Sequence, residues 1–181
     1  EKVQGVPCLL LGELQLARAQ MHLGQRRDRL SGVGVASHFE RDGEKRFEAL
    51  SLAEGYRLAG RVSGDGTVAY AWGYAQAAEA IAGLAVPPRA AWLRALALER
   101  ERIANHLGDL GYLGNDGGFA FGLSQFSRLK EDVLRANLAA FDHRMMMDFV
   151  RPGGVARDVD PPALRALADQ SLALEREIRT V

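Results

Sequence analysis

The stretch Arg89–Leu113, RAAWLRALALERERIANHLGDLGYL, decides the fold predicted for this chain. Its large apolar side chains recur at three- and four-residue steps, which is the period of one face of an α-helix. They are Trp92, Leu96, Ile103, Leu107 and Leu110. The same wheel places four polar side chains on the opposite face, namely Arg94, Glu101, Asn105 and Asp109. The stretch therefore predicts a long helix that packs along one apolar stripe.

Three ionisable residues of this helix, Glu99, Arg102 and His106, do not fall on that polar face. At ~100° per residue they project along or beside the predicted apolar stripe. Charged groups on a core-facing ridge must satisfy one another or face a polar partner. Two interpretations follow: a salt-bridge network between packed helices, or a polar wall that tunes a neighbouring site or cofactor.

Helical periods continue on both sides of this stretch. We expect one helix from about Phe47 to Val62 and another, capped by Asp65 or Thr67, that runs to about Ala82 and stops at Gly83. A glycine-rich break at 111–122 leads to a helix that ends near Phe149 at the Arg151–Gly154 segment. A last helix, capped by Asp160 and started by Pro161, is expected to turn three leucines inward. They are Leu164, Leu167 and Leu172.

The first forty-odd residues have a different period. Apolar side chains alternate at Leu14 and Leu16 and again from Val33 to Phe39, with turn residues between them, which predicts a meander of two or three strands. The predicted fold class is thus mainly α with a small N-terminal β element. We expect a β meander over residues 1–45 and a bundle of long helices over residues 46–181.

Composition excludes several classes of protein. One cysteine, Cys8, among 181 residues permits neither an intrachain disulfide nor a cysteine-ligated cluster, and the four histidines have no ligand spacing. A formal net charge of zero argues against nucleic-acid binding. The most apolar stretch, Ala69–Val86, contains Gln76 and Glu79 and predicts a buried helix rather than a membrane span. Because the chain begins without methionine, we expect a fragment of a longer protein.

Further candidate sites lie in loops. Asp116 sits in the glycine-rich break, where backbone could approach a ligand, although a turn or cap aspartate explains it equally well. The joint Arg61–Thr67, RVSGDGT, could bind an anion before a helix start, or act as a hinge. The run Met145–Met147 suits core filling or an interface. No nucleophilic triad, P-loop or dinucleotide fingerprint is present in the sequence.

Segments of this chain, in order, resemble one family: the large subunit of nickel–iron hydrogenases and the related quinone-site subunit of respiratory complex I. The segments are Glu44–Glu48 (EKRFE), Val86–Ala90 (VPPRA), Glu99–Leu107 (ERERIANHL), Asp116, Gln125–Glu131 (QFSRLKE) and Arg151–Val155 (RPGGV). The Gln125–Glu131 segment is closest to the membrane-bound hydrogenase branch, which includes formate hydrogenlyase. The resemblance implies part of a hydrogenase large-subunit-like helical fold.

The resemblance also implies where chemistry has been lost. In hydrogenases of this family an Arg-x-Cys-Gly-x-Cys stretch occupies the joint and binds the nickel–iron centre. Here Ser63 and Gly66 occupy the two cysteine positions. A serine hydroxyl is a poor ligand for a soft metal site and glycine supplies none. We therefore expect no metal and no cofactor bound by this chain, and no hydrogen chemistry at nickel.

The complex I branch implies other positions. Its quinone-site histidine falls on Glu40, with His38 nearby, and its tyrosine falls on Gly64, while the acidic residue is kept as Asp116. The residues expected on the polar ridge and toward an iron–sulfur partner subunit are Arg61, Glu99, Arg102, His106 and Arg151.

Three hypotheses remain from the sequence. The first is a subunit of a hydrogenase-like or NADH-quinone oxidoreductase-like electron-transfer complex, possessing no nickel–iron site of its own and working with quinone and an iron–sulfur cluster held by a partner. The second is a catalytically inactive structural or assembly paralogue of that subunit, and the third is an unrelated helical binding module. The first two imply a cytoplasmic protein, peripheral on the inner membrane and attached to it only through partners.

Overall fold

The computed structural model describes residues 45–181. After a helical turn at residues 45–48, the elements are α3 (Gly55–Ala59), α4 (Thr67–Ala82), α5 (Pro88–Asp116), α6 (Ala120–Phe141), β1 (Val150–Arg151), β2 (Gly154–Val155) and α7 (Pro161–Ile178). The mainly helical prediction is confirmed for this part of the chain. The predicted N-terminal β meander, with Cys8, His38 and Glu40, lies outside the described residues.

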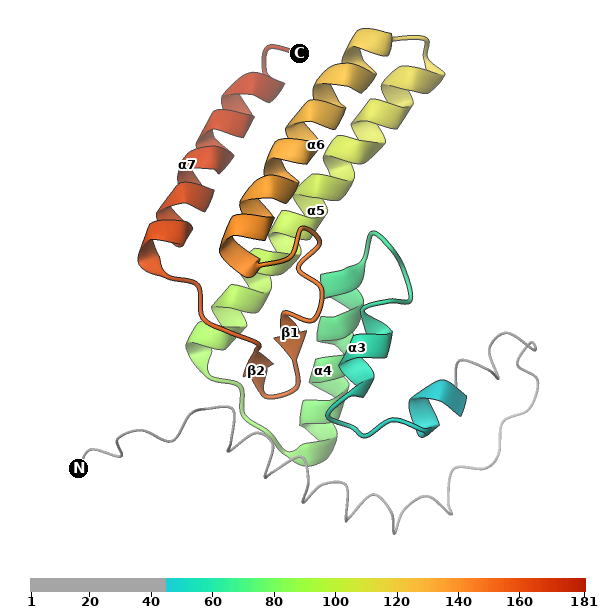
Figure 1. Ribbon diagram of the computed structural model, residues 1–181, viewed down its shortest axis with the longest axis vertical. Coiled ribbons are helices and arrows are strands. Elements are labelled where there is room, and N and C mark those ends of the chain that lie inside the picture. The colour runs from blue at the N-terminus through green and yellow to red at the C-terminus, as the bar shows by residue number, and fades with distance from the viewer. Residues whose placement is uncertain (1–44) are drawn as a thin grey trace.

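Helices α5 and α6 form a long antiparallel pair, and α7 runs beside α6 (Figure 1). Helices α3 and α4 pack together at the other end of α5. The short strands β1 and β2 pair antiparallel, with Val150 opposite Val155, and they contact α4 and α5 respectively. The α5–α6 pair is thus the support on which every other described element is placed.

The core has two parts along this pair. One lies where α4, α5, the end of α6, the hairpin and the start of α7 meet, with Phe141 and Phe149 in edge-to-face contact. The other lies between α5, α6 and α7 around Leu107, Leu129 and Leu174. Burial of these apolar side chains is the main favourable term that holds the helices together.

The sequence predicted the buried stripe of α5 only in part: Leu107 is buried, and Leu96 and Ile103 pack against the core. Trp92 is 78% exposed and Leu110 is also exposed. The buried residues of α5 are Ala90, Leu93, Arg94, Ala97, Arg100, Glu101, Ala104, Leu107 and Gly111, and of these only Leu107 belongs to the predicted stripe. Alanines let the neighbouring backbones approach closely, so the interface is set by small residues rather than by the large apolar ones.

Several predicted boundaries are confirmed and others are wrong. Helix α4 ends at Gly83 in the left-handed conformation, and Asp160 caps α7 by accepting from the Ala163 N–H at 2.7 Å. The glycine-rich break is shorter than predicted, since α5 runs on through Asp116. The helix predicted from Phe47 to Val62 is a helical turn followed by the five-residue α3. Leu172 is exposed, because Leu174 takes the inward position on α7.

The segment after α6 departs most from prediction. Helix α6 ends at Phe141 rather than near Phe149, and Asp142, Met146 and Asp148 have positive φ angles. The predicted helix end at Arg151–Gly154 is in fact the turn of the β1–β2 hairpin, where Gly153 has a φ of +85° that suits glycine. No helix of residues 45–181 combines the length and apolar character needed to cross a membrane.

Candidate functional site

The joint between α3 and α4, residues 61–66, is the position where the sequence predicted lost metal ligands. Arg61 donates from both terminal nitrogens to the Asp148 carboxylate, at 2.8 Å each, and so ties the joint to the segment after α6. The hydrogen bond from Arg61 lowers the pKa of Asp148. Arg61 is therefore engaged within the chain at an exposed ion pair, rather than free at a ridge.

The N-terminus of α4 is occupied by a side chain from α5. Gly66 offers no capping side chain, and the Glu101 carboxylate accepts instead from the backbone N–H groups of Val68 at 2.6 Å and Ala69 at 3.0 Å. Burial raises the pKa of Glu101, and these two hydrogen bonds oppose the rise. The Val68 and Ala69 N–H groups already donate to Glu101, so they are not available to bind an anion at the joint. This favours the hinge interpretation of the joint over the anion-binding one.

Asn105 continues this contact, donating to the Asp65 carbonyl at 2.7 Å, while the Ser63 hydroxyl donates to the Asp65 carboxylate. The latter bond lowers the pKa of Asp65. A cavity of about 10 Å³ lies beside Glu101 and Asn105, and its lining comes from α5, α6 and the segment after α6. The lining includes Glu101, Asn105, Asn137 and Arg144. This volume suits about one water molecule and is far too small for a quinone ring.

The predicted cavity residues are not gathered in one place. Gly64 is exposed, and a side chain added there would meet open space. Asp116 is the last residue of α5 and is also exposed. It lies eleven residues beyond Asn105, which touches the joint, and so about 16 Å along the helix from it. Glu40 lies outside the described residues. Any site that uses both Gly64 and Asp116 must therefore extend along α5.

The ridge of Glu99, Arg102 and His106 does not face the core, so that prediction is wrong. All three side chains are exposed, and Arg102 forms only a surface ion pair with Glu99 one turn away. The physical reason is the rotated stripe of α5. Once Ala97 and Ala104 face inward, positions 99, 102 and 106 must turn outward.

Arg151 is half-buried and supports its own hairpin. Its guanidinium donates to the carbonyls of Val155 at 3.3 Å and Ala156 at 2.8 Å. Its role toward a partner subunit stays a prediction.

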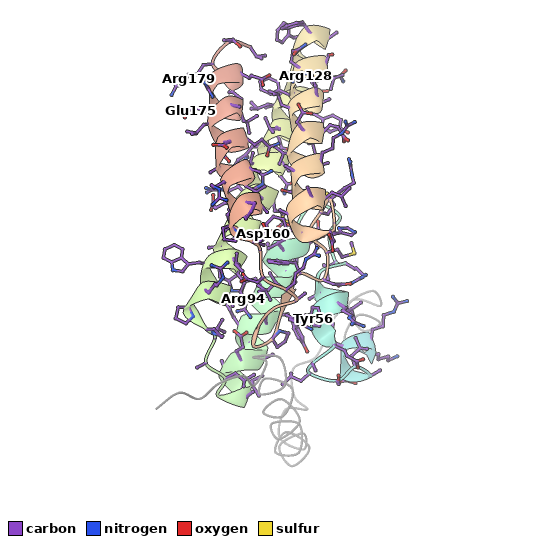
Figure 2. All side chains as sticks on the ribbon, turned by 60° about the vertical axis from the view of Figure 1, so that its left-hand side comes forward. Tyr56, Arg94, Arg128, Asp160, Glu175 and Arg179 are labelled. Atoms are coloured by element: carbon purple, nitrogen blue, oxygen red, sulfur yellow. The ribbon has the colours of Figure 1, made fainter. Side chains whose placement is uncertain are left out.

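The sequence prediction missed a buried ion pair that fixes this hairpin. Arg94 of α5, labelled in Figure 2, lies among the other helices. It donates to the Glu79 carboxylate of α4 at 2.5 and 3.2 Å, and also to the carbonyls of Gly154 and Arg151. Glu79 in turn accepts from the Gly153 N–H at 2.8 Å. Both side chains are almost fully buried. The spacing of Arg94, Ala97 and Glu101 at three- and four-residue steps could have revealed this face.

A second buried arginine lies deeper between α5, α6 and α7. Arg100 donates to the Asn137 side chain at 2.8 Å, the Val133 carbonyl at 3.1 Å and the Gln170 side chain at 2.6 Å. Its Nη1 has no partner within the described residues, and no carboxylate pairs with it there. Burial lowers the pKa of Arg100 to about 10. The Arg100 side chain therefore joins all three helices, although burial of its charge without a carboxylate partner is unfavourable.

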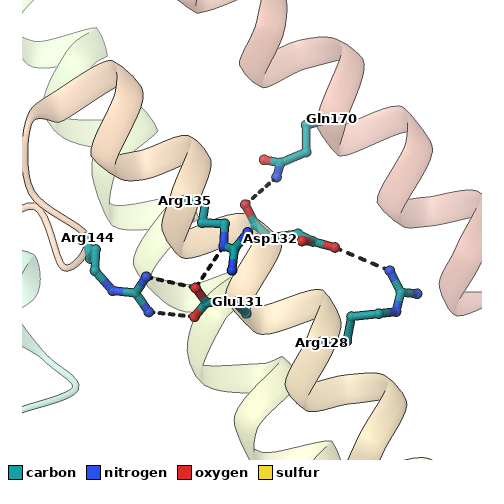
Figure 3. Close-up of polar contacts among 6 residues, drawn as sticks. All are labelled: Arg128, Glu131, Asp132, Arg135, Arg144 and Gln170. Atoms are coloured by element: carbon teal, nitrogen blue, oxygen red, sulfur yellow. Dashed lines mark hydrogen bonds and ion pairs between the residues drawn. The ribbon is translucent and has the colours of Figure 1, made fainter.

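Charged pairs on the outer face of α6 fasten the neighbouring segments (Figure 3). Glu131 accepts from Arg135 of the same helix and from both terminal nitrogens of Arg144, which lies after α6. The two arginines lower the pKa of Glu131 to about 2. Gln170 of α7 donates to the Asp132 carbonyl at 2.7 Å. The joint, the segment after α6 and α7 are thus all held from α5 and α6.

The donor set at the joint does not fit a nickel–iron centre. The Ser63 hydroxyl already donates to the Asp65 carboxylate, and Gly66 has no side chain. Within residues 45–181 no group of three histidine, cysteine or carboxylate side chains is placed to hold a metal ion. Both the geometry and the ligand chemistry therefore give this joint no means of holding the metal.

Comparison with known proteins identifies partial relatives. The NADH-quinone oxidoreductase D 1 subunit of Roseiflexus sp. (strain RS-1) is 32% identical over 136 residues, which cover 75% of this chain and 36% of the relative. The membrane-bound hydrogenase alpha subunit of Pyrococcus furiosus is 34% identical over 112 residues, covering 62% and 26%. The NADH-quinone oxidoreductase D subunit of Carboxydothermus hydrogenoformans is 34% identical over 125 residues, covering 69% and 34%. The chain thus spans about a third of the length of these curated relatives. No protein-family model matches it.

Proposed function

We propose that this chain, a distant homologue of part of the NADH-quinone oxidoreductase D subunit and of the membrane-bound hydrogenase alpha subunit, is a component of an electron-transfer complex of that kind, without a nickel–iron site of its own. The proposal rests on the residues found at the joint between α3 and α4. The alignment supports the shared scaffold, while Ser63 and Gly66 supply no thiolate where the family binds its metal.

In this proposal the chain forms part of the wall of a quinone site and holds no redox centre itself. An iron–sulfur partner subunit holds the cluster, and a quinone binds against the exposed Gly64 side of the joint, with the rest of its cavity supplied by partners. Asp116, about 16 Å away along α5, would act at the edge of that site. The complex would lie on the cytoplasmic face of the inner membrane and reach it through other subunits.

A second candidate function is a structural or assembly paralogue with no chemistry. The closed state of the joint favours it, since Glu101 fills the α4 N-terminus and Asn105 and Ser63 both bond to Asp65. Such a protein would stabilise the complex without touching the substrate.

The test purifies the tagged full chain with its bound subunits and measures metals and quinone reduction. We expect iron in the complex, nickel far below one atom per chain, and a rate that falls in Asp116→Asn. Asp169→Asn, an exposed aspartate on α7, is the matched control and should leave the rate unchanged. Stoichiometric nickel would contradict our interpretation of Ser63 and Gly66. If the complex assembles and its rate of quinone reduction is unchanged in Asp116→Asn, the structural paralogue would be favoured.

A further inference from the structure

The tip of the α5–α6 pair exposes an apolar surface. We define the apolar tip as Tyr112 and Leu113 of α5 with Phe119 and Phe121 at the start of α6. Tyr112 is 69% exposed and Leu113 is 67% exposed. The two phenylalanine rings touch each other, with centroids 5.8 Å apart, yet both are also exposed. Exposed large apolar groups gathered in one place mark an interaction surface more often than isolated ones do.

The apolar tip projects beyond the third helix of the bundle. The end of α7 is level with Arg128, because Arg128 pairs with Glu177 near the last turn of α7. Helix α6 begins at Ala120, eight residues earlier, so about 12 Å of the α5–α6 pair extends past that level. In Figure 1 the turn between α5 and α6 lies at the upper end of the molecule, a little above the last turn of α7. Within residues 45–181 no other helix covers it.

Two carboxylates bracket the apolar tip. Asp109 and Asp116 are seven residues apart on α5, so they lie on one face and about 10 Å from each other. Tyr112 and Leu113 lie between them on the same face. Both aspartates are exposed, and neither forms an ion pair within the described residues. Residues 109–123 contain no lysine or arginine, and Lys130 of α6 extends its ammonium over Gly108, next to Asp109, so Asp116 is the less screened of the two charges.

We propose that the apolar tip docks a partner subunit that presents an apolar depression between two cationic side chains about 10 Å apart. That spacing is two turns of a helix, or alternate same-face positions of a strand. The proposal rests on the proposed function, which makes the chain a component of a larger complex. The charges argue against two other occupants. A second copy would bring like charges together, and an anionic membrane would repel the aspartates.

The experiment uses the tagged full chain with the subunits that co-purify with it. In Asp109→Lys/Asp116→Lys the affinity for the partner should fall roughly tenfold or more, because like charges would then face each other across the interface. Leu113→Ala should also weaken binding. In Asp109→Asn/Asp116→Asn binding should become insensitive to NaCl, whereas salt should weaken the wild-type complex. Asp169→Lys on α7 and Trp92→Ala at the other end of α5 are the controls and should bind as wild type.

The outcomes are distinguishable. A complex that assembles equally well with the charge-reversed tip would overturn the docking proposal and leave the proposed function standing. A wild-type chain that co-purifies with no other subunit would overturn both. Two further results would also overturn the docking proposal: dimerisation of the isolated chain that Leu113→Ala abolishes, and sedimentation of the chain with phosphatidylglycerol vesicles.

Discussion

The buried ion pair between Arg94 and Glu79 gives the sharpest test of this structure. The Arg94 side chain is 2% exposed and that of Glu79 is 8% exposed. Truncation in Arg94→Ala would leave the Glu79 carboxylate buried, with the Gly153 N–H as its one remaining partner among the described residues. It would also remove one hydrogen bond each from the carbonyls of Gly154 and Arg151. Breaking a buried pair by removing one partner costs about 3–5 kcal/mol, so we expect a loss of that size in the free energy of unfolding.

The matched control is another arginine–glutamate pair on the same helix. Arg102 is 62% exposed and pairs with Glu99. Exposed pairs contribute about 0–1 kcal/mol, so Arg102→Ala should be nearly neutral. If the ridge faced the core, as the sequence alone predicted, both substitutions would carry the large cost.

The assay is urea unfolding of the full chain at neutral pH, followed by circular dichroism, with the midpoint and slope fitted for each variant. A double variant, Glu79→Leu/Arg94→Met, removes both charges together and should recover most of the lost stability, because the cost lies in the unpaired charge. Equal midpoints for Arg94→Ala and Arg102→Ala would refute the reasoning, as would a double variant less stable than Arg94→Ala.

Three further predictions follow from single contacts. Burial raises the pKa of Glu101 above its usual 4.5. The protonated Glu101 side chain therefore contributes fully to the free energy of unfolding below about pH 4.5, and this contribution is lost as the pH rises through the raised pKa. Glu101→Gln should remove this fall in stability from a profile measured from about pH 4 to about pH 8. Gly55→Ala should destabilise by about 1–3 kcal/mol, because the new methyl would overlap the ring of Tyr74, while Gly73→Ala, which meets open space within α4, should stabilise by about 0.5–1 kcal/mol in the same urea assay. Asp160→Ala should cost about 1 kcal/mol by removing the α7 cap, and an unchanged melting temperature would contradict that role.

The sequence predicted helices well where local chemistry ends them. Gly83 and Asp160 stop and start helices by their own backbone and side-chain preferences, and both predictions are confirmed. The segment after α6 could not be predicted in this way. Its bend depends on Asp148 reaching Arg61 and on Arg144 reaching Glu131, and these tertiary contacts leave no period in the sequence.

The candidate site failed to follow from the sequence for a related reason. A helical wheel weighted by large apolar residues turned α5 toward Trp92, whereas the packed face is lined with alanine and carries charged side chains. Arg94 and Glu101 are tolerated inside because each finds partners on another element, and a wheel contains no information about partners. Neither the fastening of the hairpin nor the capping of α4 was therefore visible before the helices were assembled.

These contacts also explain how the scaffold can persist while the joint changes. In the nickel–iron hydrogenases that the sequence resembles, the corresponding stretch supplies metal ligands, which would fix its conformation through bonds to the metal. Here the same segment is held from outside. Glu101 caps α4, Asn105 fixes the Asp65 carbonyl and Arg61 reaches Asp148. Within the joint the Ser63 hydroxyl donates to the Asp65 carboxylate, while a side chain at Gly64 would meet only open space. Serine and glycine at these two positions therefore leave intact the contacts that position α4, because Glu101 and Asn105 of α5 supply them from outside the joint.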